Sequence, residues 1–359
     1  MKGNAQMEKI KVAVIGCGTI ANSAHIPSYM KCEEAEIKYF CDIIPERATT
    51  AVEKYGCGIA ITDYREALAD PEVTAVSVCT PNYAHKEISV AALAAGKSVL
   101  CEKPAARTLS EAEEMLEAQK KYGKILNIGV VNRFNDNVRE IKKIIDAGTL
   151  GEIYHVYVSF RAHRSIPGLG GAFTTKAVAG GGVLIDWGVH YLDIVMYCCG
   201  DPTPKTVSAE TFAKLGNPME DYVYESMWAG PPKYDGTCDV EESISGIIRT
   251  DGPIITVHGS WAQNIYENDG RYIDFMGTKA GIRLWYGGKF KVYGVKDGKL
   301  TTEEIDVVNS NMFENEINAF VRDSVTQEKL PSHIEVNIKT QRIMEALYAS
   351  AETHKEVTL

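Results

Sequence analysis

The chain has 359 residues, of which 45% are hydrophobic and 24% are charged, and its formal net charge is −10. This composition is typical of a globular protein long enough for two domains, and the acidic balance without a basic cluster argues against a nucleic-acid partner. No apolar run is long enough to cross a membrane, so we expect no membrane partner. The nine cysteines show no C-x-x-C spacing, so we expect reduced thiols, a cytoplasmic location and no bound metal.

The first part of the chain alternates between strand-like and helix-like segments. A β-branched run at residues 9–15 predicts a buried strand. Further strands are predicted at 37–41, 73–79, 98–101 and 125–130, and helices at 83–95 and 108–122. This alternation predicts an α/β domain with a doubly wound, Rossmann-type parallel sheet. We place this domain at residues 1–131.

The pattern changes after residue 132. Residues 135–147 predict a helix, and the segments 240–250 and 254–262 flank an Asp-Gly turn that predicts a hairpin. The other predicted strands are 151–164, 271–276, 282–286 and 290–295, and residues 313–353 are predicted to be helical with a break around Pro331. Residues 132–359 are therefore expected to form an α+β domain. The stretches 168–182 and 216–236 are predicted to be long loops of the kind that often bind ligands.

A glycine-rich turn, Gly-Cys-Gly-Thr-Ile-Ala, directly follows the first predicted strand. In such a turn Gly16 makes the tight bend, Gly18 lets the backbone approach a pyrophosphate and Ala21 allows the helix to pack closely. Asp42 ends the next strand about 20 residues later, where it would accept hydrogen bonds from a ribose 2′-hydroxyl and repel a 2′-phosphate. The expected cofactor is therefore NAD. Arg47 is expected to be a solvated residue on the helix after Pro45, but it could instead bind a 2′-phosphate, so dual use of NAD and NADP stays open.

Four short fragments need one explanation: Thr80–His85, Glu102–Pro104, Asn132–Phe134 and Asp186–His190. The first two follow predicted parallel strands, at the edge where doubly wound sheets bind ligands. Asp186 and His190 are four residues apart on a predicted helix, so their side chains project the same way. Three glycines at 180–182 would let the start of this helix approach another backbone or a ligand closely.

An acid and an imidazole at this spacing have other interpretations. They can form a pair on the surface of a helix, or they can be two ligands of a metal. The flanking residues are apolar, which argues against a solvated face, and no further metal ligand is evident. We therefore interpret Asp186 and His190 as catalytic side chains.

Together these motifs resemble the glucose–fructose oxidoreductase/inositol dehydrogenase/rhizopine-catabolism family, and the resemblance covers essentially the whole chain. It implies an N-terminal Rossmann domain and a C-terminal domain with a large open, mainly antiparallel sheet, which binds the substrate and pairs subunits. It also implies that Lys103, Asp186 and His190 hold the reacting hydroxyl. His190 is then the base, since an imidazole titrates near neutral pH, while Lys103 stabilises the developing alkoxide. Asp186 would orient His190 or accept from a neighbouring substrate hydroxyl.

The same resemblance extends the predicted cofactor site. Glu102 is expected to touch the cofactor ribose or to hold Lys103, and the bond before Pro104 is expected to be cis. The residues predicted to bind the cofactor are Gly16, Cys17, Gly18, Thr19, Ile20, Asp42, Thr80, Asn82, His85, Glu102 and Lys103. For His85, a merely structural place at the start of a helix is an equal alternative. His25 is expected only to cap or pack.

The donor-rich segment from Arg161 to Gly168 is the expected substrate side. Arg161, His163 and Arg164 could face a sugar or polyol, or could end a basic surface strand, and Trp187 could stack on a sugar ring. Arg133 completes the predicted substrate residues. The family resemblance favours oxidation of a pyranose or glycoside, at C3. An inositol dehydrogenase, a glycoside hydrolase that recycles its NAD and a non-catalytic NAD sensor remain as alternatives, and a homo-oligomer is expected.

Overall fold

The computed structural model describes residues 9–266 and 270–359, which form two compact units that we describe one at a time. The first unit comprises the described residues up to 105 together with 110–134 and 310–335, and the second comprises 106–109, 135–309 and 336–359. The boundary predicted after residue 131 lies close to Phe134, where the main part of the first unit ends. The return of 310–335 to the first unit was not predicted, because a linear sequence does not show where the chain folds back.

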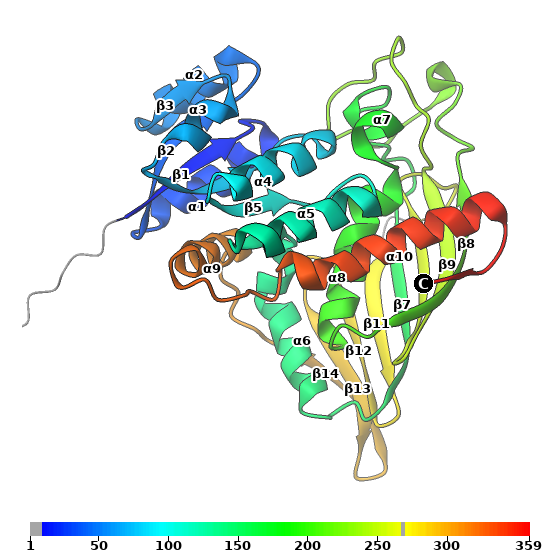
Figure 1. The fold of residues 1–359 in the computed structure, drawn as a ribbon. Coiled ribbons are helices and arrows are strands. Elements are labelled where there is room, and N and C mark those ends of the chain that lie inside the picture. Colours follow the sequence, from blue (N-terminus) through cyan, green and yellow to red (C-terminus); the bar gives the residue numbers. More distant parts are fainter. Residues whose placement is uncertain (1–8, 267–269) are drawn as a thin grey trace, which may run out of the picture. The chain divides into compact units, whose positions relative to one another are not determined.

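The first unit is built on a six-stranded parallel sheet (Figure 1). Its strands are β1 (Ile10–Ile15), β2 (Ala35–Cys41), β3 (Ile59–Ile61), β4 (Val73–Val78), β5 (Ser98–Glu102) and β6 (Leu126–Gly129), in the order β3-β2-β1-β4-β5-β6. The predicted doubly wound sheet is confirmed. The strand order reverses between β1 and β4, and ligands of such sheets bind outside the carboxyl ends at this point.

Short helices connect the strands of the first unit. They are the π-helix η1 (Ala21–His25), α1 (Ile26–Lys31), α2 (Pro45–Tyr55), α3 (Tyr64–Ala69), the 3-10 turn η2 (Asn82–Ala84), α4 (His85–Ala94), α5 (Leu109–Tyr122), the 3-10 turn η3 (Val131–Phe134) and α9 (Met312–Thr326). The helix predicted at 83–95 is thus a 3-10 turn followed by an α-helix. The core includes Phe320 and Val321 of α9 together with apolar residues of β1, β2 and α1. This packing explains why residues 310–335 return to the first unit.

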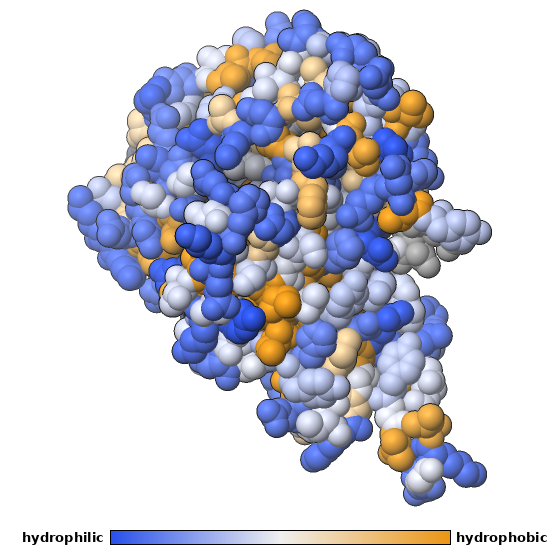
Figure 2. Space-filling view, turned by 90° about the vertical axis from the view of Figure 1, so that its right-hand side faces the viewer, coloured by the Kyte–Doolittle hydropathy of each residue, from blue (hydrophilic) through white to orange (hydrophobic). Residues whose placement is uncertain are grey.

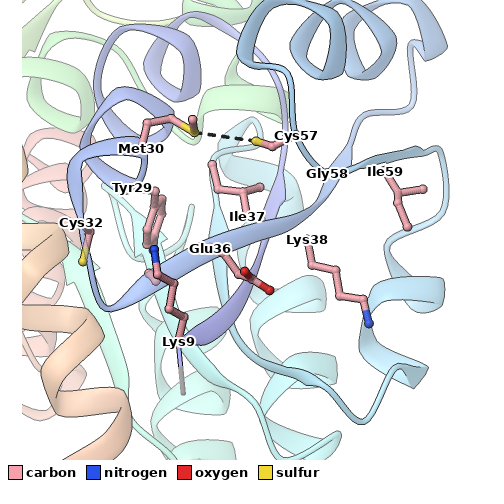
Figure 3. Close-up of a pocket in the computed structure, with 11 residues that line it drawn as sticks. Lys9, Tyr29, Met30, Cys32, Glu36, Ile37, Lys38, Cys57, Gly58 and Ile59 are labelled. Atoms are coloured by element: carbon pink, nitrogen blue, oxygen red, sulfur yellow. Dashed lines mark hydrogen bonds between the residues drawn. The ribbon is translucent and has the colours of Figure 1, made fainter. Parts of the chain in front are cut away.

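A pocket of about 440 Å³ lies at the edge of the first unit where β1, β2 and β3 begin. Figure 3 shows Met30 and Cys57 side by side in its wall, with 3.7 Å between their sulfur atoms. Tyr29 and Lys38 also line it. Parallel α/β sheets bind their ligands at the opposite, carboxyl edge. This pocket is therefore separate from the glycine turn.

The second unit is built on a nine-stranded sheet. Its strands are β7 (Ile153–Arg161), β8 (Pro204–Phe212), β9 (Ser243–Thr250), β10 (Ile254–Ser260), β11 (Arg271–Gly277), β12 (Ala280–Trp285), β13 (Phe290–Lys296), β14 (Lys299–Ile305) and β15 (Val357–Thr358), in the order β14-β13-β12-β11-β7-β10-β9-β8-β15. Only β7 and β10 pair in parallel among these strands. The expected mainly antiparallel sheet and the β9–β10 hairpin are confirmed. Strand β14 was not predicted because its sequence is largely polar.

Helices cover one face of this sheet. Figure 1 shows α6 (Asp136–Asp146), α8 (Val189–Cys198) and α10 (Ile334–Thr353) on that face, and their apolar side chains share one core with the strands. The shorter helices are η4 (Ala172–Thr174), α7 (Lys176–Ala179), η5 (Leu184–Gly188) and η6 (Met219–Asp221). Buried residues alternate with exposed ones along β9 and with partly buried ones along β12. This alternation is typical of a sheet with one packed face.

Several bulk properties can be checked directly. All nine cysteines are free thiols. No helix within 9–266 and 270–359 combines the length and apolarity needed to cross a membrane. On the face of the molecule shown in Figure 2, hydrophilic residues predominate and hydrophobic ones gather in small separate patches. The bond between Lys103 and Pro104 is cis, as expected.

Candidate active site

The glycine turn has the backbone geometry that its sequence predicts. Gly16 has a φ of +94°, and a Cβ atom there would lie only 2.6 Å from the carbonyl oxygen of Cys79 at the end of β4. At Gly18 a Cβ atom would meet nothing within 4 Å. The first glycine is therefore required by the fold, whereas the second leaves open space above the turn. That open space is what a pyrophosphate against the backbone needs.

Asp42 folds back onto this turn. Its Oδ2 accepts a hydrogen bond from the backbone N–H of Cys17 at 2.9 Å, and its Oδ1 accepts one from Ile44 at 2.9 Å. The guanidinium of Arg47 lies 3.9 Å from Oδ2. A carboxylate has about four acceptor positions, so Asp42 keeps capacity to bind a ribose hydroxyl. The structure thus brings Asp42 and the glycine turn together.

A polar atom without a partner lies at the same edge of the sheet. The hydroxyl of Thr80 is buried, and it has no hydrogen-bond partner among the described residues. A buried hydroxyl left without a partner costs about 1–3 kcal/mol, so a bound molecule that pairs with it is favoured. The positive φ of Gly16, the open space at Gly18 and this hydroxyl all fit a dinucleotide. Asn82, also predicted to bind the cofactor, begins η2 beside this strand end.

Glu102 is held by protein groups. Its Oε1 lies 2.7 Å from Nε2 of His25, and its Oε2 accepts a hydrogen bond from the backbone N–H of Lys103 at 3.1 Å. Burial raises the pKa of Glu102, but the His25 contact and the nearby Lys103 charge lower that pKa by more. The carboxylate therefore stays ionised and supports Lys103. His25, expected only to cap or pack, is part of this arrangement.

His85 is also engaged by the protein. Its ring is fully buried, with Nδ1 2.8 Å from the carbonyl oxygen of Pro104 and Nε2 2.9 Å from that of Thr80. Burial lowers the pKa of His85 although both carbonyls act to raise it. The ring joins the two strand ends and has no exposed surface for a nicotinamide. We therefore leave it out of the proposed cofactor contacts.

Arg133 lies away from solvent in the first unit. It is 2% exposed, and its Nη1 donates to the carbonyl oxygen of Pro331 at 2.8 Å. Its guanidinium thus anchors the returning segment 310–335 by a main-chain contact. The prediction that Arg133 binds the substrate finds no support in this arrangement, and we leave it out of the proposed site.

In the second unit, Asp186 and His190 lie on consecutive helical segments of different type. Asp186 is in the π-helix η5 and His190 is in the first turn of α8. A π-helix has i to i+5 hydrogen bonds and often marks a functional site, so the expectation of a regular α-helical pair needs this correction. Nε1 of Trp261 donates to Oδ2 of Asp186 at 3.3 Å. The ring of His190 lies 6.4 Å from that of Tyr286.

Glu241 fixes the start of this helical region. Its Oε2 accepts from the backbone N–H of Gly182 at 2.9 Å, and its Oε1 accepts from Leu184 at 3.1 Å and from the hydroxyl of Tyr348 at 2.8 Å. A Cβ atom at Gly182 would collide with the carbonyl oxygen of Glu241, and one at Gly181 would collide with the Tyr348 hydroxyl. Because they lack side chains, Gly181 and Gly182 leave room for the Tyr348 hydroxyl and the Glu241 backbone. Close approach of another backbone is one of the two roles predicted for these glycines, the other being close approach of a ligand.

Two of the predicted substrate residues, Arg161 and Trp187, lie near strand ends of the second unit. Arg161 ends β7 and is paired in register with Ser260, which precedes Trp261. Arg271, at the start of β11, places its guanidinium 6.0 Å from the ring of Trp187. Arg271 thus lies beside Trp187, the residue after Asp186. Side chains alternate along a strand and Phe160 packs in the helix-covered core, so the Arg161 side chain points to the opposite face of the sheet, where its Nε donates to the Oγ of Ser159 at 3.2 Å.

The donor-rich segment divides into two parts. The Nη2 of Arg164 donates to Asn264 at 2.5 Å, and its guanidinium lies over the ring of Tyr222 at 5.7 Å. The carbonyl oxygen of His163 accepts from the backbone N–H of Gln263 at 2.9 Å. The Arg164 side chain thus binds a neighbouring loop, whereas the Arg161 side chain donates to Ser159 of its own strand.

The comparison with known families agrees with this geometry. An oxidoreductase family with an NAD-binding Rossmann fold matches residues 10–130, and the GFO/IDH/MocA C-terminal domain matches residues 138–283. The chain belongs to the GFO/IDH/MocA oxidoreductase family. Its first unit is thus the family's NAD-binding domain, and the resemblance drawn from the motifs is confirmed.

Relatives in the family act on sugars and cyclitols. The chain is 33% identical over 361 residues to the D-glucoside 3-dehydrogenase of Escherichia coli K12, covering 100% of both chains. It is 26% identical to the scyllo-inositol 2-dehydrogenase (NADP(+)) IolW of Bacillus subtilis, covering 100% of this chain and 98% of the relative. The structure of levoglucosan dehydrogenase in complex with NADH and levoglucosan superposes with a TM-score of 0.82 at 21% identity, covering 98% and 99% of the two chains. This last likeness shows the fold.

Several side chains that contact or flank the predicted site residues were not themselves predicted to belong to the site. They are His25, Glu241, Trp261, Arg271, Tyr286 and Tyr348. Trp261 carries a local signal, because it is a large aromatic near the end of a predicted strand. The others meet their partners only through the path of the chain. Within the described ranges, no cluster of three or more His, Cys, Asp or Glu side chains could hold a metal ion.

Proposed function

We propose that the protein is an NAD-dependent dehydrogenase that oxidises a ring hydroxyl, at C3, of a pyranose sugar or glycoside. The observation that carries the proposal is the fixed placement of Asp186. Its carboxylate accepts from the buried Trp261, and the helical region that also bears His190 starts on Glu241. An acceptor and a base are thus held at one end of the second sheet. The full-length identity to a D-glucoside 3-dehydrogenase supports the substrate class.

The proposed chemistry gives each reactive residue one role. NAD, when bound, supplies the acceptor for the hydride that leaves the carbinol carbon. His190 takes the hydroxyl proton, so that the C–H and O–H bonds break as the carbonyl forms. Lys103 stabilises the charge that develops on the oxygen, and Asp186 orients His190 or accepts from a neighbouring hydroxyl. A Lys103→Ala protein that is folded and keeps full activity would contradict this assignment.

The proposed substrate contacts lie around Trp187. An indole face stacks well on the apolar face of a pyranose, and Arg271 borders this position with donors for hydroxyl groups. His163 and Arg164 follow Arg161 in the same segment, and we propose that they meet a group attached to the ring. A glycoside offers such a group, whereas an inositol does not.

An inositol dehydrogenase is the second candidate. The observation that favours it is the likeness over the whole chain to the inositol dehydrogenase of Bacillus subtilis. A cyclitol presents a similar ring of hydroxyl groups, so the same acceptor, base and cation would serve.

A substrate panel decides between these functions. The purified protein is incubated with NAD⁺ and, in parallel, with glucose, alkyl and aryl glucosides, C-glucosides and inositols, while NADH absorbance and product mass are followed. NADH with a glucoside product two hydrogens lighter is the expected result. NADH only with inositols would establish the second candidate. Aglycone release without net NADH would establish an NAD-recycling hydrolase. Bound NAD without any turnover would favour a sensor.

We further propose that the protein is a homo-oligomer that pairs through the sheet of the second unit. The face of the sheet without helices exposes Ile247, Tyr293 and Val295. A groove runs between β11 and β13 on the same sheet and includes Met276 and Tyr293. An exposed apolar sheet face is a typical site of subunit association.

A further inference from the structure

We propose that His25 and Glu102 form a buried positioning pair that holds Lys103 in place and ties it to the helix that follows the cofactor turn. The inference rests on the proposed role of Lys103 in the reaction. It assigns a function to His25, a buried histidine that the proposed chemistry itself does not use.

The pair bridges two elements of the first unit. Nε2 of His25 lies 2.7 Å from Oε1 of Glu102, and His25 is 1% exposed. The second carboxylate oxygen accepts the backbone N–H of Lys103 at 3.1 Å. One carboxylate therefore joins the imidazole to the main chain at the root of the lysine side chain. A shift of His25 would be passed to Lys103 through a single rigid group.

The orientation of the His25 ring is itself fixed. Its Nδ1 lies 3.4 Å from the hydroxyl of Ser77, and that hydroxyl lies 2.7 Å from the hydroxyl of Tyr29. Ser77 and Tyr29 are buried. Either hydroxyl can donate, so Ser77 can donate to Nδ1 and leave the ring proton on Nε2, which faces Glu102. Figure 3 shows Tyr29 in the wall of the pocket at the other end of this chain of contacts.

His25 is linked to the cofactor turn because it is the last residue of the π-helix η1, which starts at Ala21. Asn22 pins the same segment to the turn, since its side-chain amide donates to the carbonyl oxygens of Cys17 and Gly18 at 2.9 and 3.1 Å. Turn, π-helix and His25 thus form one connected piece. Single π-turns are common at functional sites, where they displace a side chain from its α-helical position.

The energetics explain why this pair needs both members. Removing the donor to a buried carboxylate leaves a charge without its hydrogen-bond partner, which is strongly destabilising. Burial raises the pKa of the Glu102 carboxyl, and His25 and Lys103 hold that pKa below its usual value. The other titratable groups that interact with Glu102 are Cys79, Cys101 and His85. Without His25, Glu102 would be expected to protonate or move, and Lys103 would lose its support.

Two substitutions of His25 separate positioning from mere packing. His25→Gln places an amide N–H where Nε2 lies and can still donate to Glu102, whereas His25→Asn can reproduce only the Nδ1 position. We expect His25→Asn to lower kcat by about 10- to 100-fold, the size of effect caused by a misplaced catalytic group, and His25→Gln to restore most of it. His333→Asn is the matched control, because it removes another buried imidazole of the first unit. It should leave kcat unchanged.

The second test combines the His25 substitution with Lys103→Ala. If His25 acts through Lys103, His25→Asn should have no further effect on kcat in a Lys103→Ala protein, because residues of one functional unit are not additive. Equal loss in both backgrounds, or equal behaviour of His25→Gln and His25→Asn, would overturn the proposal. Should His25→Asn fail to fold, Tyr29→Phe removes only the hydroxyl that contacts Ser77, the partner of the His25 ring, and should give a smaller loss with the same dependence on Lys103.

A readout without turnover keeps this inference distinct from the proposed function. The acetylation rate of Lys103 by acetic anhydride in NAD-free protein is measured by mass spectrometry against Lys86, an internal reference on α4. We expect His25→Asn to change the ratio several-fold and His25→Gln and His333→Asn to leave it unchanged. If Lys103→Ala keeps full activity while these ratios change, the proposed catalytic role of Lys103 is wrong, but the proposal that His25 positions the Lys103 side chain holds. Unchanged ratios in His25→Asn would overturn the positioning.

Discussion

The indole of Trp261 donates a hydrogen bond to the carboxylate of Asp186, with 3.3 Å between Nε1 and Oδ2. Trp261 is among the most completely buried large side chains of the chain, so the donor cannot turn away. The backbone N–H of Ser165 donates to the carbonyl oxygen of Trp261 at 2.8 Å, which links this tryptophan to the donor-rich segment. The buried Trp261, which directly follows β10, therefore fixes the orientation of the Asp186 carboxylate.

Trp261→Phe should weaken catalysis without unfolding the protein. The ring volume is largely kept, but the donor to Asp186 is lost. A hydrogen bond to a charged group contributes about 1.5–3 kcal/mol, and the 3.3 Å distance places it at the lower end, so kcat/KM should fall about 10-fold. Steady-state kinetics on the substrate found in the panel provides the measurement. Trp285→Phe, on β12, should leave kcat/KM unchanged, and an unaffected Trp261→Phe would show that Asp186 needs no such donor.

Gly182→Ala should destabilise the protein and reduce its activity. The added methyl group collides with the backbone of Glu241, so either Glu241 or the start of the helical region at Gly182 must move. Overpacking of this kind costs about 1–3 kcal/mol, and the shift reaches Asp186. Urea unfolding and kcat should both report the change. At Gly288 a Cβ atom would meet only ordinary contacts, so Gly288→Ala should be nearly neutral in both measurements.

Asp42→Ser should change the preference between NAD and NADP. The substitution removes the negative charge that would face a 2′-phosphate, while Arg47, now 3.9 Å from that carboxylate, would face the phosphate instead. Juxtaposed like charges cost several kcal/mol, so the ratio of kcat/KM for NAD to that for NADP should fall by about 100-fold. In Asp42→Ser/Arg47→Ala the gain with NADP should be lost. A retained NAD preference in the single variant would contradict the role of Asp42.

Asp323 should make stability depend on pH. Burial raises the pKa of this carboxyl from 3.8 to about 6, although Arg322 lowers it. Between these pH values the folded protein keeps a proton that the unfolded chain has lost, so stability falls as pH rises through about 6. Asp323→Asn should remove this decline and gain about 1–2 kcal/mol at pH 8.

Urea unfolding at pH 4.5 and pH 8 measures that difference. Glu303→Gln, an exposed substitution on β14, should leave the pH dependence as it is in the unchanged protein. A decline that persists in Asp323→Asn would assign the pH dependence to other buried carboxyl groups.

Charges on the helix-free sheet face should dissociate the proposed oligomer. Ile247→Lys combined with Tyr293→Glu places two charges on that face, where burial against a second subunit would be costly. Light scattering after size exclusion should show a smaller particle than for the unchanged protein. Val325→Lys, at an exposed apolar position of α9, is the control and should leave the particle mass unchanged. A monomeric unchanged protein would overturn the oligomer itself.

Local sequence patterns determined much of the fold. The alternation of strand and helix signals predicted the parallel sheet, and the Asp-Gly turn predicted the pairing of β9 and β10. The start of α6 was also readable, since Asn135 caps it by accepting from Asn137 and Val138. Such features depend on backbone preferences and on hydrogen bonds between near neighbours. They are therefore present in the sequence without knowledge of the chain path.

The tertiary structure alone decided how the site is supported. Glu102 meets His25 across 77 residues of sequence, Gly182 meets Glu241 across 59 and Asp186 meets Trp261 across 75. No periodicity encodes such contacts, because they depend on the path of the chain between distant elements. The sequence by itself identified the reactive residue types and the glycines that admit close approach. Only the folded chain decided which buried partner fills the space that each glycine leaves and which group orients each reactive side chain.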